Sequence, residues 1–188
     1  MEFTLKYRSK IIIGAIAPFL SEDKRVLDIG CGNGVVSYEI KKHFNCNLVG
    51  TDILNYLKRD IPLKKTIDED KLDFKDNEFD LGLFNDALHH MPYNTQFKLI
   101  KEALRVCSKV IIFEVKPTFI AKAVDYLINR IHNSDMPIPL SFREEREWTQ
   151  RFKEEGISFE IFNVKKPVCL YPFSNFLFIL TYDKKQVN

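Results

Sequence analysis

The chain has 188 residues, of which 45% are hydrophobic and 29% are charged. This composition excludes a disordered chain and is typical of one globular domain with a core of its own. Its 28 basic and 26 acidic residues are scattered along the sequence without a basic stripe, so nucleic acid is not favoured as a partner.

The apolar run at residues 11–17 follows three basic residues, as in a signal peptide, but it is too short and leads directly into a strand-like segment. We therefore predict an amphipathic first helix within residues 1–20. No apolar run approaches the roughly 20 residues that a membrane span needs. The cysteines have no CxxC pair and no metal-ligand spacing, which predicts no disulfide framework, no metal site and a reducing, cytoplasmic location. They are Cys31, Cys46, Cys107 and Cys169.

Short apolar runs then alternate with helical patterns, which indicates βαβ units and a parallel sheet covered on both faces. The predicted strands are residues 25–29, 47–51, 64–67, 79–85 and 110–115. Apolar residues at helical spacing predict helices over residues 35–44 and 95–107, the second with Asn94 as its N-cap. We assign residues 21–116 to a cofactor-binding half.

The pattern changes after residue 116, and residues 117–188 form an acceptor-side half. Thr118 is placed to cap a helix, and the capping-box pattern of Ser141 to Glu144 predicts a further helix that ends near Gly156. Two strand patterns follow, at residues 158–164 and 177–182. Because no helical crossover separates them, we expect them to pair antiparallel.

The most informative stretch is VLDIGCGNGVVS at residues 26–37, a buried strand that leads through a glycine turn into a helix. Its glycines form G-x-G-x-G, whereas the dinucleotide fingerprint is G-x-G-x-x-G, so a nicotinamide cofactor is disfavoured. Asp28 at the end of the strand suits a ligand with a cationic amino group. Asp52 ends the next strand, where an acid accepts hydrogen bonds from ribose hydroxyls. The pattern supports a ribose and not a pyrophosphate.

With these motifs the sequence resembles the class I S-adenosylmethionine-dependent methyltransferases, especially the small-molecule branch called type 11. The stretch 26–37 resembles the family's first motif, LVGTDI at 48–53 its second, and IDEDKLDFKDNEFDLGLFNDALHHM at 67–91 its third region. The resemblance implies a single α/β domain over residues 1–188 with S-adenosylmethionine as cofactor. It implies a Rossmann-like, doubly wound sheet of seven strands in the order 3-2-1-4-5-7-6, mostly parallel with an antiparallel C-terminal strand, and helices on both faces.

The resemblance also implies the residues around the cofactor. Asp68 takes the place of the adenine-binding aspartate and Glu69 would offer its backbone amide, although Asp73 stands where the family usually has proline. Asn85 ends the fourth strand, where its amide either meets the ligand or only caps a turn. The expected set is Asp28, Gly30, Cys31, Gly32, Asn33, Gly34, Asp52, Ile53, Asp68, Glu69 and Asn85.

The acceptor side is less defined by the sequence. His89 and His90 are adjacent, and either is a candidate general base or a packing residue; we choose His89 because it lies closer to Asn85. Arg8 on the first helix either pairs with the cofactor carboxylate by a forked contact or belongs to a solvated helix face. The apolar and aromatic segment 119–142 would suit an apolar or planar acceptor, or would simply pack on the sheet.

We therefore expect a methyltransferase that acts on a small molecule by direct in-line transfer. The sulfonium of the cofactor already activates the methyl group, so the enzyme mainly positions the nucleophile. A methyltransferase acting on RNA or protein shares every cofactor residue and remains an alternative, as does a non-catalytic cofactor-binding module of the same fold. The sequence does not specify an oligomeric state.

Overall fold

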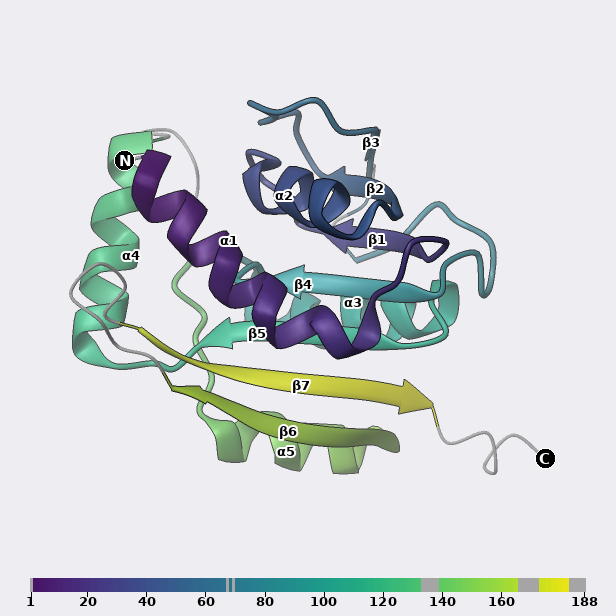
Figure 1. Ribbon diagram of the computed structural model, residues 1–188. Coiled ribbons are helices and arrows are strands. Elements are labelled where there is room, and N and C mark those ends of the chain that lie inside the picture. Colours follow the sequence, from purple (N-terminus) through teal and green to yellow (C-terminus); the bar gives the residue numbers. More distant parts are fainter. Residues whose placement is uncertain (1, 67, 69, 133–138, 166–172, 183–188) are drawn as a thin grey trace.

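The computed structural model describes residues 2–66, 68, 70–132, 139–165 and 173–182 (Figure 1). All seven strands lie in one sheet with the order β3-β2-β1-β4-β5-β7-β6. β1 to β5 run parallel, and β7 is antiparallel to both β5 and β6. The expected strand order and the antiparallel terminal pair are confirmed. The strands are β1 Arg25–Ile29, β2 Asn47–Asp52, β3 Leu63–Lys65, β4 Leu81–Asn85, β5 Val110–Val115, β6 Ile157–Lys165 and β7 Ser174–Tyr182.

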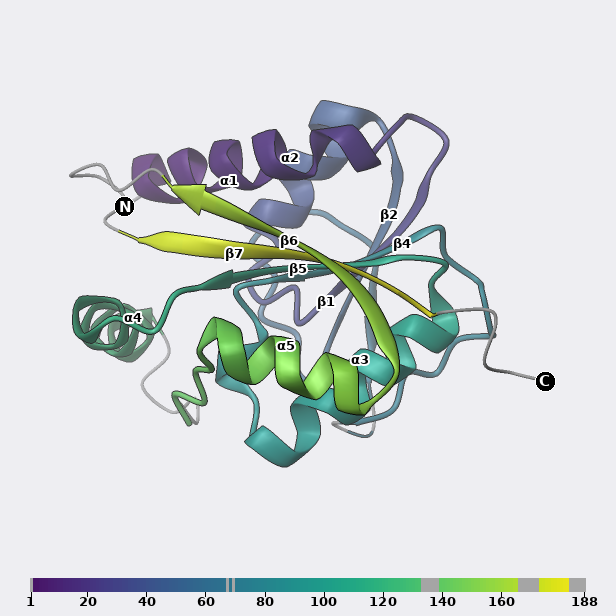
Figure 2. The ribbon, with the colours of Figure 1, turned by 90° about the horizontal axis from the view of Figure 1, so that it is seen from below.

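Helices cover both faces of this sheet. α1 (Glu2–Ile16) and α2 (Val35–Phe44) lie on one face, and α3 (Tyr93–Val106) and α5 (Glu145–Glu154) on the other (Figure 2). Ile12 of α1 and Ile40 of α2 belong to the core of the first face, whereas Phe97 of α3 and Trp148 of α5 belong to that of the second. Each face is thus closed by two helices, as a parallel sheet buried on both sides requires.

α4 (Phe119–His132) stands apart, beyond the ends toward which β4 and β5 point (Figure 1). Two short 3₁₀ helices complete the fold: η1 (Ala17–Phe19) follows α1, and η2 (Leu88–His90) follows β4. Because the carboxyl ends of parallel strands form the ligand edge of such sheets, α4 and η2 lie on the edge that matters for function. No helix in the described part of the chain is long and apolar enough to cross a membrane.

Two helix starts differ from the sequence prediction. α3 begins at Tyr93 rather than 95, because the Pro92 carbonyl accepts the N–H of Thr95; Asn94 therefore lies inside the first turn and is not the cap. α5 begins at Glu145, and its capping box joins Glu144 and Glu147 instead of starting at Ser141. The backbone of Ser141 is occupied elsewhere, by His89 O and the Gln96 amide.

Other local predictions hold. The N–H of Ala121 donates to Thr118 Oγ1 at 3.1 Å, so Thr118 caps α4 as expected. Gly156 follows α5 with φ of 66°, the left-handed conformation typical of a residue that ends a helix. β3 and β4 are shorter than predicted. β4 begins at Leu81, because Phe79 makes only an isolated bridge to Cys107.

Candidate functional site

The glycine turn between β1 and α2 leaves one position open. Gly30, Gly32 and Gly34 all have positive φ, a conformation that glycine adopts without strain. A Cβ at Gly30 would lie 2.9 Å from the Ala87 Cβ, and one at Gly34 would lie 2.6 Å from a methyl group of Leu57. A Cβ at Gly32 would meet no described atom within 4 Å. Gly30 and Gly34 are thus needed for packing, while Gly32 faces the space through which a ligand would approach the backbone.

Most of the amides of this turn are already engaged within the protein. Gly30 and Cys31 donate to the Thr51 carbonyl, Gly34 donates to Cys31 O, and Val35 donates to the Asn33 side chain. A pyrophosphate needs unoccupied backbone N–H groups at such a helix start. The turn therefore suits a ligand without phosphate, in agreement with the exclusion of dinucleotides.

Asp52, at the end of β2, lies directly beside the turn. One carboxylate oxygen accepts the Gly32 N–H at 2.8 Å, and the other accepts the Ile53 N–H at 2.8 Å. Burial raises the pKa of Asp52, an effect that these amide bonds partly offset. A carboxylate offers about four acceptor positions, so Asp52 keeps capacity for the hydroxyl donors of a ribose. The structure thus brings together the two features that predicted a nucleoside site.

Asp28 lies behind the turn and is only 1% exposed. Its carboxylate accepts the Ser37 hydroxyl at 2.5 Å and the Asn85 side-chain amide at 3.0 Å. Burial raises the pKa of Asp28 to about 6, against these hydrogen bonds. Asp28 therefore joins the ends of β1 and β4 to the first turn of α2, and its contact with a ligand amino group stays a prediction.

The remaining residues of the expected cofactor set are spread more widely. Cys31 is half-buried against Gly50, and burial raises the pKa of its thiol. Ile53 is 46% exposed at the end of β2, and Asp68 is exposed on the loop after β3. Glu69 lies outside the described residues. Their roles at the cofactor stay predictions.

On the far side of Asn85, Arg8 joins α1 to the end of β4. Its Nε lies 2.9 Å from Asp86 Oδ2, and its Nη2 donates to the Asn85 carbonyl at 3.0 Å. Arg8 thus contacts two groups of the protein itself, and its forked contact with the cofactor carboxylate stays a prediction. Asp86 has φ of 51°, which is uncommon outside glycine, and burial raises its pKa. Asp86 was not predicted from the sequence, although an acid directly after a buried apolar strand was a usable signal.

His89 lies in η2 next to Asn85 and Asp86, and it is 2% exposed. Its Nδ1 lies 2.6 Å from Glu114 Oε2, while Glu114 Oε1 accepts the Leu88 N–H at 2.7 Å. Burial acts to lower the pKa of His89, but Glu114 and Asp125 outweigh it and raise the pKa to about 10. An imidazole that keeps its proton at neutral pH is a poor general base. The catalytic role of His89 thus stays a prediction that this geometry does not favour.

Glu114 and Asp125 are the other side chains that the sequence analysis missed. Glu114 is the one charged residue of the buried strand VIIFEV, an anomaly that could have identified it. Asp125 lies on α4 within the predicted acceptor segment, 3.5 Å from His89 Nε2. That segment is divided: Phe142 is buried and stacks on His89, whereas Phe119 is 86% exposed. Met136 and Pro137, also expected there, lie outside the described residues.

Comparison with known proteins identifies this architecture. Residues 27–112, which include the glycine turn, Asp52 and Asn85, match the model of a family described as methyltransferase domain. The matched stretch, just under half of the chain, thus has the sequence of a methyltransferase domain. This match, together with the fold of methyltransferases that depend on S-adenosylmethionine, supports the expected family, enzyme class and cofactor.

Solved structures agree in fold. A methyltransferase from Archaeoglobus fulgidus that depends on S-adenosylmethionine aligns with a TM-score of 0.67 and 16% identity, over 95% of this chain and 97% of that one. One from Methanosarcina mazei aligns with a TM-score of 0.63 and 18% identity, over 89% and 96%. A chain from the complex between the Haloferax volcanii methyltransferase activator Trm112 and a methyltransferase aligns with a TM-score of 0.71 and 14% identity, over 96% and 92%. At these identities the likeness is one of fold.

A curated relative extends the similarity in sequence. An uncharacterised protein of Haemophilus influenzae is 28% identical over 99 residues, which are 46% of this chain. The matched part spans 39% of that protein's own length.

Proposed function

We propose that this chain transfers the methyl group of S-adenosylmethionine directly to a small acceptor molecule. The observation that carries the proposal is the open position at Gly32 beside Asp52, at the carboxyl ends of β1 and β2 in a methyltransferase domain. When bound, the cofactor supplies a methyl group that its sulfonium already activates. The protein then has to bind, orient and exclude water.

Each side chain of the site has a task in this proposal. Asp52 accepts hydrogen bonds from the ribose hydroxyls, and Gly32 lets the ligand approach the backbone. Asp28 holds Asn85 in place through the 3.0 Å hydrogen bond, which sets the end of β4 relative to β1. We assign adenine binding to Asp68 and Glu69. The rest of the cofactor site is lined by Cys31, Asn33 and Ile53.

A small acceptor fits the charge of the chain better than a macromolecule does. The basic and acidic residues number 28 and 26, an even balance that does not favour RNA as a partner. The free thiols of Cys31, Cys46 and Cys107 support a reducing, cytoplasmic setting. We place the acceptor at the edge formed by α1, η2 and α4, where an apolar or planar molecule would approach the cofactor.

Calorimetry with S-adenosylhomocysteine tests the cofactor site. We expect the wild type to bind and Gly32→Val to lose binding by roughly tenfold or more, because the new side chain fills the ligand's space. Gly156→Val is the matched control, since it carries the same positive-φ strain at the start of β6, away from the cofactor edge. Equal affinities of the wild type and Gly32→Val would contradict the proposal.

A screen of candidate metabolites for release of S-adenosylhomocysteine then tests the acceptor class. Turnover with small molecules supports the proposal. Transfer confined to RNA or protein would replace it with the macromolecular alternative, and tight cofactor binding without turnover in any class would indicate a non-catalytic module.

A further inference from the structure

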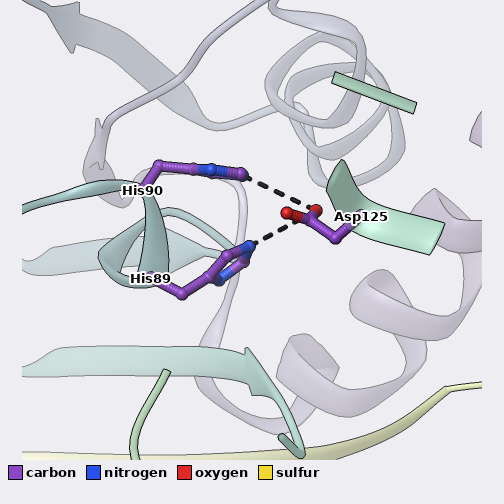
Figure 3. Close-up of side chains that lie close together, drawn as sticks. All are labelled: His89, His90 and Asp125. Atoms are coloured by element: carbon purple, nitrogen blue, oxygen red, sulfur yellow. Dashed lines mark ion pairs between the residues drawn. The ribbon is translucent and has the colours of Figure 1, made fainter. Parts of the chain in front are cut away.

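We propose that His89, His90 and Asp125 form a site for a divalent transition-metal ion of the zinc class, held between η2 and α4. Figure 3 shows both imidazoles, which come from η2, directed at the carboxylate of Asp125 on α4. One ligand atom from each of the three residues lies within 4.8 Å of the other two. Two imidazoles and one carboxylate are a donor set that zinc, cobalt and nickel prefer over magnesium or calcium.

The distances fit an ion better than they fit direct contacts. His89 Nε2 lies 3.5 Å, and His90 Nε2 lies 3.8 Å, from Asp125 Oδ1. Both separations exceed those of well-formed hydrogen bonds. Ligands at 2.0–2.2 Å from a tetrahedral zinc ion lie roughly 3.4 Å from one another. The three side chains are therefore spaced as ligands around a common centre.

A buried nitrogen also points to this centre. Among the described residues, His89 Nε2 is enclosed and has no hydrogen-bond partner. Buried polar atoms in proteins almost always have one. An ion bound at Nε2 would satisfy this nitrogen and displace any proton on it.

Further contacts hold the His89 ring in the orientation that an ion requires. Its Nδ1 lies 2.6 Å from Glu114, the arrangement in which a second carboxylate fixes the tautomer of a metal-binding histidine. Phe142 stacks on the ring with centroids 4.5 Å apart and planes inclined by 14°. The free nitrogen is thereby directed toward Asp125.

The local charge favours a cation as well. In the described part of this edge, the carboxylates of Asp86, Glu114 and Asp125 lie near Arg8 and the His89 ring, and a bound ion would take the place of the proton on that ring. Three protein ligands would leave a fourth position on the ion for water or for an acceptor oxygen. Bound there, the ion would also tie α4 to η2, adding to the small apolar cluster of Val115, Ala121 and Phe142.

The test is a titration of the untagged, chelator-treated full chain with Zn²⁺ and Co²⁺, without S-adenosylmethionine. We expect one ion per chain by calorimetry. Asp125→Asn should weaken affinity by at least tenfold, and Glu114→Gln by roughly 10- to 100-fold through loss of His89 orientation. His43→Ala, which removes an exposed histidine of α2, is the control and should bind like the wild type.

Nuclear magnetic resonance of the wild type keeps the test independent of variant folding. Zn²⁺ should shift the ring resonances of His89 and His90 and leave those of His43 unchanged. The proposal is overturned if the wild type takes up no ion, if the shifts miss His89 and His90, or if Asp125→Asn binds as tightly as His43→Ala. None of these outcomes depends on methyl transfer.

Discussion

The two ends of the ligand edge are built in opposite ways. Around β1 and β2, polar contacts join backbone amides to one carboxylate, as when Gly32 donates to Asp52 only 20 residues away. Around β4, β5 and α4, charged side chains meet one another from distant parts of the chain. Arg8 and Asp86 are 78 residues apart, and His89 and Glu114 are 25 apart.

The region around β1 and β2, which we call the cofactor end, is built mainly from neighbouring segments of the chain. The region around β4, β5 and α4, which we call the acceptor end, is assembled from distant ones. The strand, glycine turn and helix of the cofactor end are contiguous in the sequence, and the amides of the turn find their acceptors on the neighbouring strand β2, at Thr51 and Asp52. The acceptor end, the region where we place the acceptor, forms only after α1, η2, β5 and α4 have docked. Its buried charges lose hydration in the process, so each depends strongly on its partners.

Glu114 is where this dependence should be greatest. Glu114→Ala leaves both the Leu88 N–H and His89 without their buried acceptor, and we expect a loss of about 3–5 kcal/mol in the free energy of unfolding. Urea denaturation measures it. Glu160→Ala, an exposed glutamate of β6, should change stability by no more than about 0.5 kcal/mol. A Glu114 variant as stable as this control would refute the assembled character of the acceptor end.

At the cofactor end, Asp28 offers a test through pH. Burial raises its pKa from 3.8 to about 6. The proton on Asp28 therefore stabilises the fold fully below about pH 4, and this contribution is lost as pH rises through about 6. Relative to Asp28→Asn, we expect the wild type to lose about 3 kcal/mol between pH 4 and pH 7, measured by urea denaturation.

Asp80 should show the opposite sign. The hydrogen bond from Arg25 lowers the pKa of Asp80 to about 2, so its contribution is present above about pH 4 and is lost as pH falls. Asp80 is partly exposed, and solvent screening makes its effect smaller. For each variant, the quantity to follow is the difference in free energy of unfolding between the wild type and that variant. If this difference changed with pH in the same direction for Asp28→Asn and Asp80→Asn, the opposite pKa shifts assigned to the two residues would be contradicted.

The smallest effect concerns the sugar contact of Asp52. Asp52→Ala should weaken S-adenosylhomocysteine binding by about 2 kcal/mol, the scale of charge-assisted hydrogen bonds, while Asp60→Ala, an exposed neighbour, should not. The variant also loses the Gly32 contact, so calorimetry with a 2′,3′-dideoxy analogue isolates the sugar term. If Asp52→Ala still prefers the ribose form as the wild type does, another residue binds the diol.

The sequence predicted those parts that short-range patterns determine. The glycine turn and Asp52 follow from contiguous motifs, whereas the seven-strand order came from the family resemblance. Thr118 and Gly156 mark helix ends by local chemistry alone. The start of α5 was misplaced because Ser141 bonds to His89 and Gln96, which no local pattern encodes. Local capping chemistry therefore predicts a boundary only where no tertiary contact competes for the same backbone groups.

The contacts among His89, His90, Glu114 and Asp125 were not predictable either, because they join distant segments and leave no local pattern in the sequence. Asp125 lies on a helix that reaches His89 and His90 only across the sheet edge, so the spacing of the cysteines gave no signal of this cluster. Glu114 was detectable as a charge in an apolar strand, but its partner was not. Whether a buried acid is a defect, an ion pair or a metal-site residue depends on what the fold places opposite it.

The position of β7 also constrains synthesis of the protein. β7 inserts between β5 and β6, so β5 has no neighbour on that side until residues 174–182 have emerged from the ribosome. Until then the strand VIIFEV presents a long unpaired edge rich in β-branched residues, which is a template for wrong pairing with other chains. β7 therefore protects this edge as well as completing the sheet.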